Sequence, residues 1–335
     1  MRRLTVFSAA LALAAVTAGC ADTSEGGGAT TPGDPADCFS QRPIELVVGY
    51  DAGGSTDVGA RMMATALESK LDATINVVNR PGAGGQVGLT ALANAQPDGQ
   101  TMGTVNFPSA IVSVLDESRQ AAYDRNSFAP IGLQVIDPSA VAVRPDSPIR
   151  TPTDLVEAAL AAPGRLQATT TGPASNEHFV LLELERVTGA TISPVHFSEG
   201  GAPATTAFLG GNVDLLLANV SDLTPMAANG EVRVIGVFGD ERSPFLPDVP
   251  TFAEEGHDVE VASSRGYAFP AGTPQECVTA MSEAMGEVMS DQEFIRKMQD
   301  LGLAPSHKDA EAYAQYWTES TEVFETLLPL VRAER

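Results

Sequence analysis

Residues 44–57 read IELVVGYDAGGSTD. The first half is rich in aliphatic and β-branched residues and predicts a strand over residues 44–50. Apolar residues at helical spacing after the glycines predict a helix over residues 57–71. Because a strand that leads through a glycine loop into a helix begins a βαβ unit, this stretch indicates an α/β fold.

The same alternation extends along the chain in two series, before and after the Pro-rich segment 145–148. Further strands are expected over residues 75–78, 101–105, 166–170, 192–197, 213–218 and 232–238. Further helices are expected over residues 87–94, 153–161, 176–187, 202–209 and within 274–331. This order predicts two lobes with mainly parallel sheets flanked by helices.

The helices left over at the end of the chain indicate that the first lobe is left and later re-entered. We therefore expect residues 41–142 and 265–335 to form a discontinuous first lobe and residues 143–264 to form the second. Open α/β sheets bind ligands beyond the carboxyl ends of their strands. Two facing lobes thus predict one shared ligand cleft that closes by a hinge motion.

The loop after the first strand has the composition of an anion site. Gly53 and Gly54 let backbone N–H groups turn toward a ligand, and the following helix N-terminus adds unsatisfied donors. Ser55 and Thr56 add hydroxyl groups, whereas Asp57 is expected to cap or orient the turn. The alternative interpretation is a tight turn without a ligand.

A second strand–loop–helix junction in the other lobe repeats this design. Thr171 and Gly172 follow the expected strand, and Ser175 and Asn176 open the expected helix. These residues predict a second donor loop for the same ligand. The alternative is a plain N-cap at Ser175 or Asn176.

Two further side chains near these loops are candidates for individual roles. His178 lies one turn into the second helix and is expected to pack or to orient the loop. Arg265 lies where the chain returns to the first lobe, and its guanidinium can clamp a carboxylate with two hydrogen bonds. The alternative role for Arg265 is an ion pair at the surface or between the lobes.

Charge and motifs exclude several classes of protein. The chain has 20 Lys and Arg against 43 Asp and Glu, a formal charge of -23, which disfavours nucleic acid and anionic membrane surfaces as partners. It has no G-x-S-x-G elbow, no H-E-x-x-H or Cys/His metal spacing, and no G-x-x-x-x-G-K-[ST] loop. The glycines of residues 82–88 lack the dinucleotide-binding spacing. We therefore predict no catalytic residue, no metal and no cofactor.

The N-terminal residues predict export. Arg2 and Arg3 precede an uncharged apolar stretch that ends at Cys20, which is typical of a secretory signal over residues 1–19. Because Cys20 directly follows Ala-Gly, as in the lipobox of bacterial lipoproteins, we expect lipidation there and anchoring to the outer face of the cell membrane through this lipid alone. The alternative is ordinary secretion. Residues 20–40 then form a flexible tether.

Export also determines how the other two cysteines are interpreted. An oxidising compartment favours pairing of Cys38 with Cys277 in a disulfide. Two buried free thiols are the alternative.

Several motifs occur together along most of the chain, in residues 43–48, 52–57, Arg61, 79–85, 97–101, 172–178, 209–214, 246–251, 254–256 and 270–274. In this order, over nearly all of residues 42–305, the set resembles the substrate-binding receptors of tripartite tricarboxylate transporters, the Bug-type extracytoplasmic solute receptors.

The resemblance implies a two-lobed periplasmic-binding-protein type II (Venus flytrap) fold without enzymatic activity, for which we expect a monomer. It implies capture of a small organic carboxylate, with a di- or tricarboxylate favoured, and its delivery to an integral membrane permease. The loops 53–57 and 172–178 would hold one ligand carboxylate. Further lining residues implied by the resemblance are Asn106, Ser109, Gly201 and Asn219.

The chain departs from the family pattern at two places. Asp51 stands where a small residue or proline is common, which places an acid beside the pocket and disfavours a ligand with excess negative charge. Ser264 stands where Trp is common; this opens the pocket and leaves Arg265 as a cation for a second carboxylate.

Two other functions remain open at this point. A flytrap-type sensory or surface lipoprotein would keep the fold without coupling to transport. A secreted serine hydrolase would use a serine with His178, although the elbow motif is missing.

Overall fold

The computed structural model describes residues 38–39, 42–197 and 201–333. The chain divides into two units, Met1–Pro32 and Gly33–Arg335, and the elements described below all lie in the second. The expected signal sequence, Cys20 and the tether up to residue 37 lie outside the described residues. Within the described ranges, no helix is both long and apolar enough to cross a membrane.

The first series forms the parallel unit that the sequence predicts. Strand β1 (Ile44–Val48) lies between β2 (Ile75–Asn79) and β3 (Thr101–Phe107) and is parallel to both. Helix α2 (Ser55–Leu71) connects β1 to β2, and α3 (Gln86–Ala93) precedes β3. The helix after the glycine loop thus begins two residues earlier than predicted.

The second series repeats this arrangement. Strand β5 (Gln167–Thr170) pairs in parallel with β6 (Ser193–His196) and β7 (Leu215–Asn219). Its other elements are α5 (Pro152–Ala161), α6 (Asn176–Thr188), α7 (Gly201–Leu209), α8 (Val220–Ala228) and β8 (Arg233–Phe238). The carboxyl ends of β5 and β7 therefore carry the loop at Thr171 and the start of α8.

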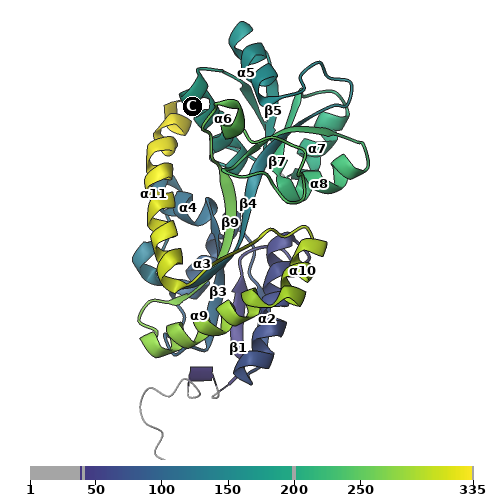
Figure 1. The fold of residues 1–335 in the computed structure, drawn as a ribbon. Coiled ribbons are helices and arrows are strands. Elements are labelled where there is room, and N and C mark those ends of the chain that lie inside the picture. The colour runs from purple at the N-terminus through teal and green to yellow at the C-terminus, as the bar shows by residue number, and fades with distance from the viewer. Residues whose placement is uncertain (1–37, 40–41, 198–200, 334–335) are drawn as a thin grey trace, which may run out of the picture. The chain divides into compact units, whose positions relative to one another are not determined.

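Three strands that the sequence analysis did not predict join the series, and one of them interrupts the stretch 274–331 that was expected to be helical. Strand β4 (Phe128–Val143) pairs antiparallel with β9 (Ala262–Pro270) over Phe128–Pro138, then with β7 and β8 over Ser139–Val143. The path through the sheet is β2-β1-β3-β9-β4-β7-β5-β6, with β8 and β10 (Pro305–Lys308) also on β4. Figure 1 shows β4 and β9 running between the two groups of strands. The fold is a two-lobed α/β flytrap whose sheet is mixed, with parallel pairs inside each series and antiparallel pairs where they join.

Strand β4 was not predicted because of its composition. Its sequence FAPIGLQVIDPSAVAV contains Pro130, Gly132 and Pro138, which normally mark breaks. Most of the strand is buried without strict alternation, because helices or neighbouring elements cover both faces. The short helices α4 (Ser109–Leu115) and α8 were also not predicted. Short 3₁₀ turns lie at Ala83–Gly85, Glu117–Arg119, Arg125–Ser127 and Ala253–Glu255.

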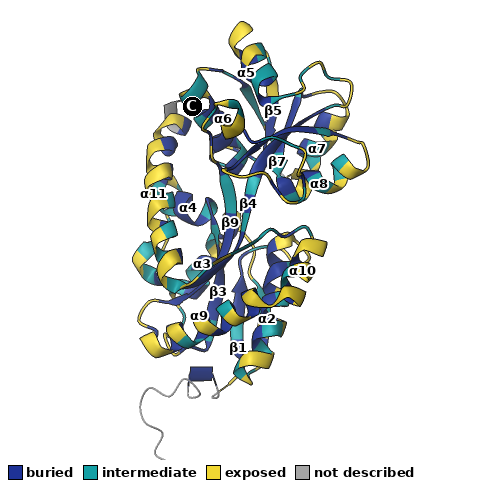
Figure 2. Cartoon of the chain, in the orientation of Figure 1, coloured by how far each residue is buried: buried dark blue, intermediate teal, exposed yellow. Residues whose placement is uncertain are grey.

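The C-terminal helices are α9 (Gln275–Ser290), α10 (Gln292–Asp300) and α11 (Ala310–Ala333). Figure 2 shows exposed residues on their outward faces and buried residues in the central strands. Along α11, Tyr313 stacks on Phe107 of β3 with ring centroids 5.9 Å apart, and Phe324 packs on Phe179 of α6 at 4.9 Å. One helix therefore packs against elements of both series.

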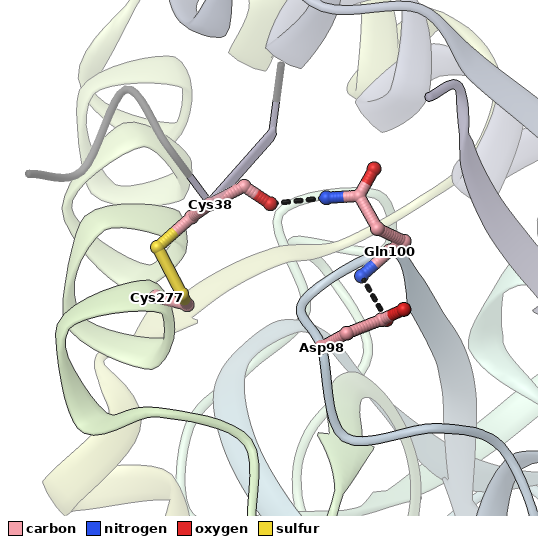
Figure 3. Close-up of a disulfide and its surroundings, with 4 residues drawn as sticks. All are labelled: Cys38, Asp98, Gln100 and Cys277. Atoms are coloured by element: carbon pink, nitrogen blue, oxygen red, sulfur yellow. Dashed lines mark hydrogen bonds between the residues drawn. A yellow bond between two sulfur atoms is a disulfide. The ribbon is translucent and has the colours of Figure 1, made fainter. Parts of the chain in front are cut away.

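The predicted disulfide is present between Cys38 and Cys277, with the Cα atoms 5.5 Å apart (Figure 3). It ties the residues that precede β1 to helix α9. The side chain of Gln100 donates to the carbonyl of Cys38, and the Gln100 backbone N–H donates to Asp98 at 2.9 Å. Gly99 lies beside this bond at φ +79°, a backbone conformation that favours glycine, and a Cβ there would lie only 3.2 Å from the carbonyl oxygen of Cys38.

Candidate functional site

The loop between β1 and α2 is held in shape by Asp57. Its carboxylate is buried and accepts from the backbone N–H of Gly53 at 2.9 Å, from Arg61 at 2.9 Å and from Asn79 at 2.8 Å. Burial raises the pKa of Asp57, but the hydrogen bonds from Arg61, Gly53 and Asn79 outweigh this effect and hold the pKa below its usual range. Asp57 therefore orients the turn, and the donors left for a ligand are those at the start of α2.

Three predicted residues of this half lie together at the ends of β1 and β3. The amide nitrogen of Asn106 donates to the hydroxyl of Thr56 at 2.8 Å, and the hydroxyl of Ser109 lies 2.7 Å from that of Tyr50. The carbonyl oxygen Oδ1 of Asn106 is buried and has no partner among the described residues. The structure thus groups Thr56, Asn106 and Ser109 beside the start of α2, where Gly54 and Ser55 also lie.

The loop after β5 differs from the expected open set of donors. The backbone N–H and hydroxyl of Thr171 both donate to one carboxylate oxygen of Glu177, at 3.2 and 2.8 Å. The N–H of Gly172 donates to the hydroxyl of Thr170 at 3.4 Å, and that of Ala174 donates to Nδ1 of His178 at 3.1 Å. The loop's own side chains therefore occupy donors that the sequence analysis assigned to a ligand.

Ser175 and His178 support this loop from the helix side. Ser175 caps α6, because its hydroxyl accepts from the N–H of His178 at 3.3 Å. His178 is buried, and its ring packs edge-on against His196 with centroids 5.0 Å apart. These contacts give His178 the packing and orienting geometry that its position predicts.

Asn176 and Asn219 contact each other at the carboxyl ends of the second group of strands. The amide nitrogen of Asn176 donates to the hydroxyl of Ser139 at 2.6 Å and to Oδ1 of Asn219 at 3.3 Å. The hydroxyl of Ser263 donates to the same Asn219 oxygen at 3.3 Å. This network links the starts of α6 and α8 to β4 and β9, and leaves Oδ1 of Asn176 buried without a partner in the described part of the chain.

Arg265 forms a buried ion pair with Asp137, at 3.3 Å between Nη2 and Oδ2. The two side chains are only 10% and 2% exposed, and Asp137 also accepts from the N–H and hydroxyl of Ser221 at 3.2 and 2.5 Å. Burial raises the pKa of Asp137 despite the opposing effects of Arg265 and Ser221. Arg265 thus has the ion pair that was the alternative role, while its Nη1 is buried and unpartnered among the described residues.

A pocket of about 380 Å³ lies at the carboxyl ends of β5 and β7. The predicted residues Thr171 and Gly201 line it, together with Glu177 and Asp222, which sequence reasoning did not select. Glu177 follows Asn176 in the first turn of α6, and Asp222 stands three residues after Asn219. Their positions just after strand ends were the signal that could have identified them.

A larger hollow of about 570 Å³ lies between α2 and the α9–α10 region. Its lining contains none of the predicted ligand residues, and its charged side chains, Arg61, Lys70, Asp291, Glu293 and Lys297, have mixed signs. Across the described residues, no group of three or more His, Cys, Asp or Glu side chains could hold a metal ion.

Two α/β units joined by long crossing strands, with polar loops at the strand ends, define the class of periplasmic solute-binding receptors. The chain belongs within that class to the tripartite tricarboxylate transporter family receptors, whose family model TctC matches residues 59–329. This membership confirms the family suggested by the motifs and the two-lobed fold, and such receptors are not enzymes.

Individual relatives agree with this assignment. A UPF0065 protein in the gbd 5' region of Cupriavidus necator is 30% identical over 288 residues, which cover 86% of each chain. The crystal structure of a TctC solute-binding protein from Polaromonas has a TM-score of 0.77 and 26% identity, covering 87% of this chain and 99% of that one. MatC from Rhodopseudomonas palustris, solved with bound malate, has a TM-score of 0.71 and 26% identity, covering 87% and 100%.

Proposed function

We propose that this protein is an extracytoplasmic solute-binding lipoprotein that captures a small carboxylate between its two lobes and delivers it to a membrane permease of the tripartite tricarboxylate type. Residues 41–142 and 265–335 form the first lobe in this proposal, and residues 143–264 form the second. Lipid on Cys20 holds the monomeric receptor at the outer face of the membrane.

The observation that carries the proposal is the junction of β1 and α2. Asp57 fixes the glycine loop, so that the first N–H groups of α2 keep one orientation. The start of a helix attracts anions through unsatisfied donors and the positive end of its dipole. Gly53, Gly54, Ser55, Thr56, Asn106 and Ser109 are proposed to surround one ligand carboxylate here.

The remaining predicted residues complete the cleft from the other side. Thr171, Gly172, Ser175, Asn176, His178, Gly201 and Asn219 are proposed to form the facing wall. The buried Nη1 of Arg265 is a further donor without a protein partner among the described residues. Malate in the related MatC structure supports a small carboxylate as the ligand.

The proposal is tested by isothermal titration of the full-length protein with acetate, malate, succinate, glutarate, tricarballylate and 4-aminobutyrate. Binding of at least one carboxylate is expected, and Thr56→Val is expected to weaken it because Thr56 is grouped with Asn106. Val87→Thr, a change at an exposed position outside the site, serves as the control. A full screen without any binding would contradict the proposal.

A further inference from the structure

The pocket at the ends of β5 and β7 carries charge of one sign. Glu177 and Asp222 are the charged residues among those that line it, and both are acids. Neither forms an ion pair with a described residue. A solute that placed a carboxylate in this pocket would meet two like charges, which costs binding free energy.

Glu177 is held at the pocket wall by its own loop. The two bonds from Thr171, at 3.2 and 2.8 Å, go to a single oxygen, Oε2. The carboxylate is therefore fixed in place while its charge is not neutralised by a cation. These bonds also remove the Thr171 N–H and hydroxyl as donors for a ligand anion.

Asp222 lies in the first turn of α8 and lines the same pocket. Its side chain is exposed to solvent within the concave surface, and the N–H of Asn219 donates to it. Restricted hydration raises the pKa of Asp222, and the nearby charges of Asp137 and Glu177 raise it further, whereas Arg265 opposes them. The guanidinium of Arg265 is already paired with Asp137 and does not line the pocket.

A buried acceptor lies at the start of α6, next to Glu177 in the sequence. Asn176 begins α6, and its amide nitrogen bonds to Asn219, the cap of α8. Asn176 is only 8% exposed, yet its Oδ1 has no donor among the described residues. An unpaired buried acceptor favours a ligand that brings an N–H or O–H group.

We propose that Glu177, Asp222 and Asn176 bind a positively charged nitrogen of the solute, so that the ligand is an amino carboxylate rather than a di- or tricarboxylate. The inference rests on the proposed function, which places the carboxylate of the ligand at the start of α2. An ammonium group supplies the positive charge that balances the two acids, and its N–H groups can donate to their carboxylates and to the unpartnered Oδ1 of Asn176.

The test compares solutes of matched length that differ in one terminal group. The full-length protein is titrated with 4-aminobutyrate, glutarate, butyrate and butylamine, and in parallel with aspartate and succinate. At least one amino carboxylate is expected to bind about tenfold or more tightly than its dicarboxylate counterpart, the effect of a charged hydrogen bond. Asp222→Asn and Glu177→Gln are expected to remove this preference.

Glu157→Gln is the matched control, because Glu157 is an exposed acid on α5 and does not line the pocket. Thermal unfolding of each variant shows whether it is folded. Tighter binding of glutarate and succinate than of the amino carboxylates would overturn the inference and leave the proposed function intact. Binding of butylamine alone would contradict the proposed function, which requires a carboxylate on the ligand. Binding of none of the probes would contradict both the inference and the proposed function.

Discussion

The hydroxyl of Thr171 lies 2.8 Å from the carboxylate of Glu177 and donates a hydrogen bond to it. This carboxylate occupies the donors that the loop would otherwise offer to a bound anion. Replacing Glu177 with alanine frees both the hydroxyl and the N–H of Thr171. We expect Glu177→Ala to raise the affinity for succinate about tenfold in calorimetric titration, and Glu157→Ala to leave it unchanged. Equal affinities for the parent and Glu177→Ala would show that Thr171 does not face the ligand.

The hydrogen bonds that Asp57 accepts predict that its carboxylate stabilises the folded protein. Asparagine at this position keeps one acceptor and loses the negative charge, so the bonds from Gly53 and Arg61 to Oδ2 are weakened or lost. We expect Asp57→Asn to lower the free energy of unfolding by about 1.5–3 kcal/mol in urea titration. Glu45→Gln, which breaks an ion pair with the half-exposed Arg80, should cost about 1 kcal/mol or less. Equal losses for the two variants would contradict the structural role of Asp57.

The buried pair of Asp137 and Arg265 predicts strong coupling between the two positions. Asp137→Asn leaves the Arg265 charge buried without a counter-charge and is expected to cost about 3–5 kcal/mol of unfolding free energy. The double variant Asp137→Asn with Arg265→Gln should lose clearly less than the sum of the single losses. A double-mutant cycle by urea unfolding measures this coupling, and additive losses would argue against the pair.

The disulfide predicts that reduction weakens the folded unit. It joins residues 239 positions apart, so it restricts the unfolded chain over most of the folded length. We expect Cys277→Ser to lower the free energy of unfolding by about 2–5 kcal/mol. The comparison is made with Cys20→Ser in both proteins, so that no third thiol exchanges with the pair. Two thiols that react with a thiol reagent in the denatured, unreduced parent would contradict the bond.

Asp222 predicts a pH dependence of stability. Because its pKa is raised in the folded state, the folded protein keeps this proton at pH values where the unfolded chain has already released it. Stability therefore falls as the pH rises from the ordinary carboxyl pKa, about 4, to the raised value. The stability difference between Asp222→Asn and the parent should shift in favour of Asp222→Asn over this interval. Urea titrations at several pH values measure it, and a constant difference would contradict the raised pKa.

Most predicted elements of the two series occur within one or two residues of their predicted bounds. Short strands such as Ile75–Asn79 and helices such as Asn176–Thr188 are set by local periodicity, which can be read without knowledge of the fold. The crossing strand Phe128–Val143 could not be read in this way. Its Pro130 and Pro138 suggest breaks, and only pairing with β9, β7 and β8 makes it a strand.

The residues of the candidate site also fall into two groups, those that the local sequence predicts and those that it does not. Gly53, Ser55 and Asp57 were selected because a strand, a glycine loop and a helix follow one another in the sequence. Glu177 was not predicted as a site residue, because only the tertiary structure shows that its carboxylate accepts from the N–H and hydroxyl of Thr171. Asp222 was passed over because its helix was not predicted.

The sequence by itself determined the alternating strands and helices and the family motifs, because these depend on local periodicity and fixed spacing. It favoured the pairing of Cys38 with Cys277 over two buried free thiols, and the structure contains the bond. Only the tertiary structure decided the partner of Arg265. The antiparallel register of β4 and β9 brings Asp137 within 3.3 Å of a guanidinium 128 positions away in the sequence. It also decided the sign of charge in the pocket, because Glu177 and Asp222 meet only when β5 and β7 are neighbours in the sheet.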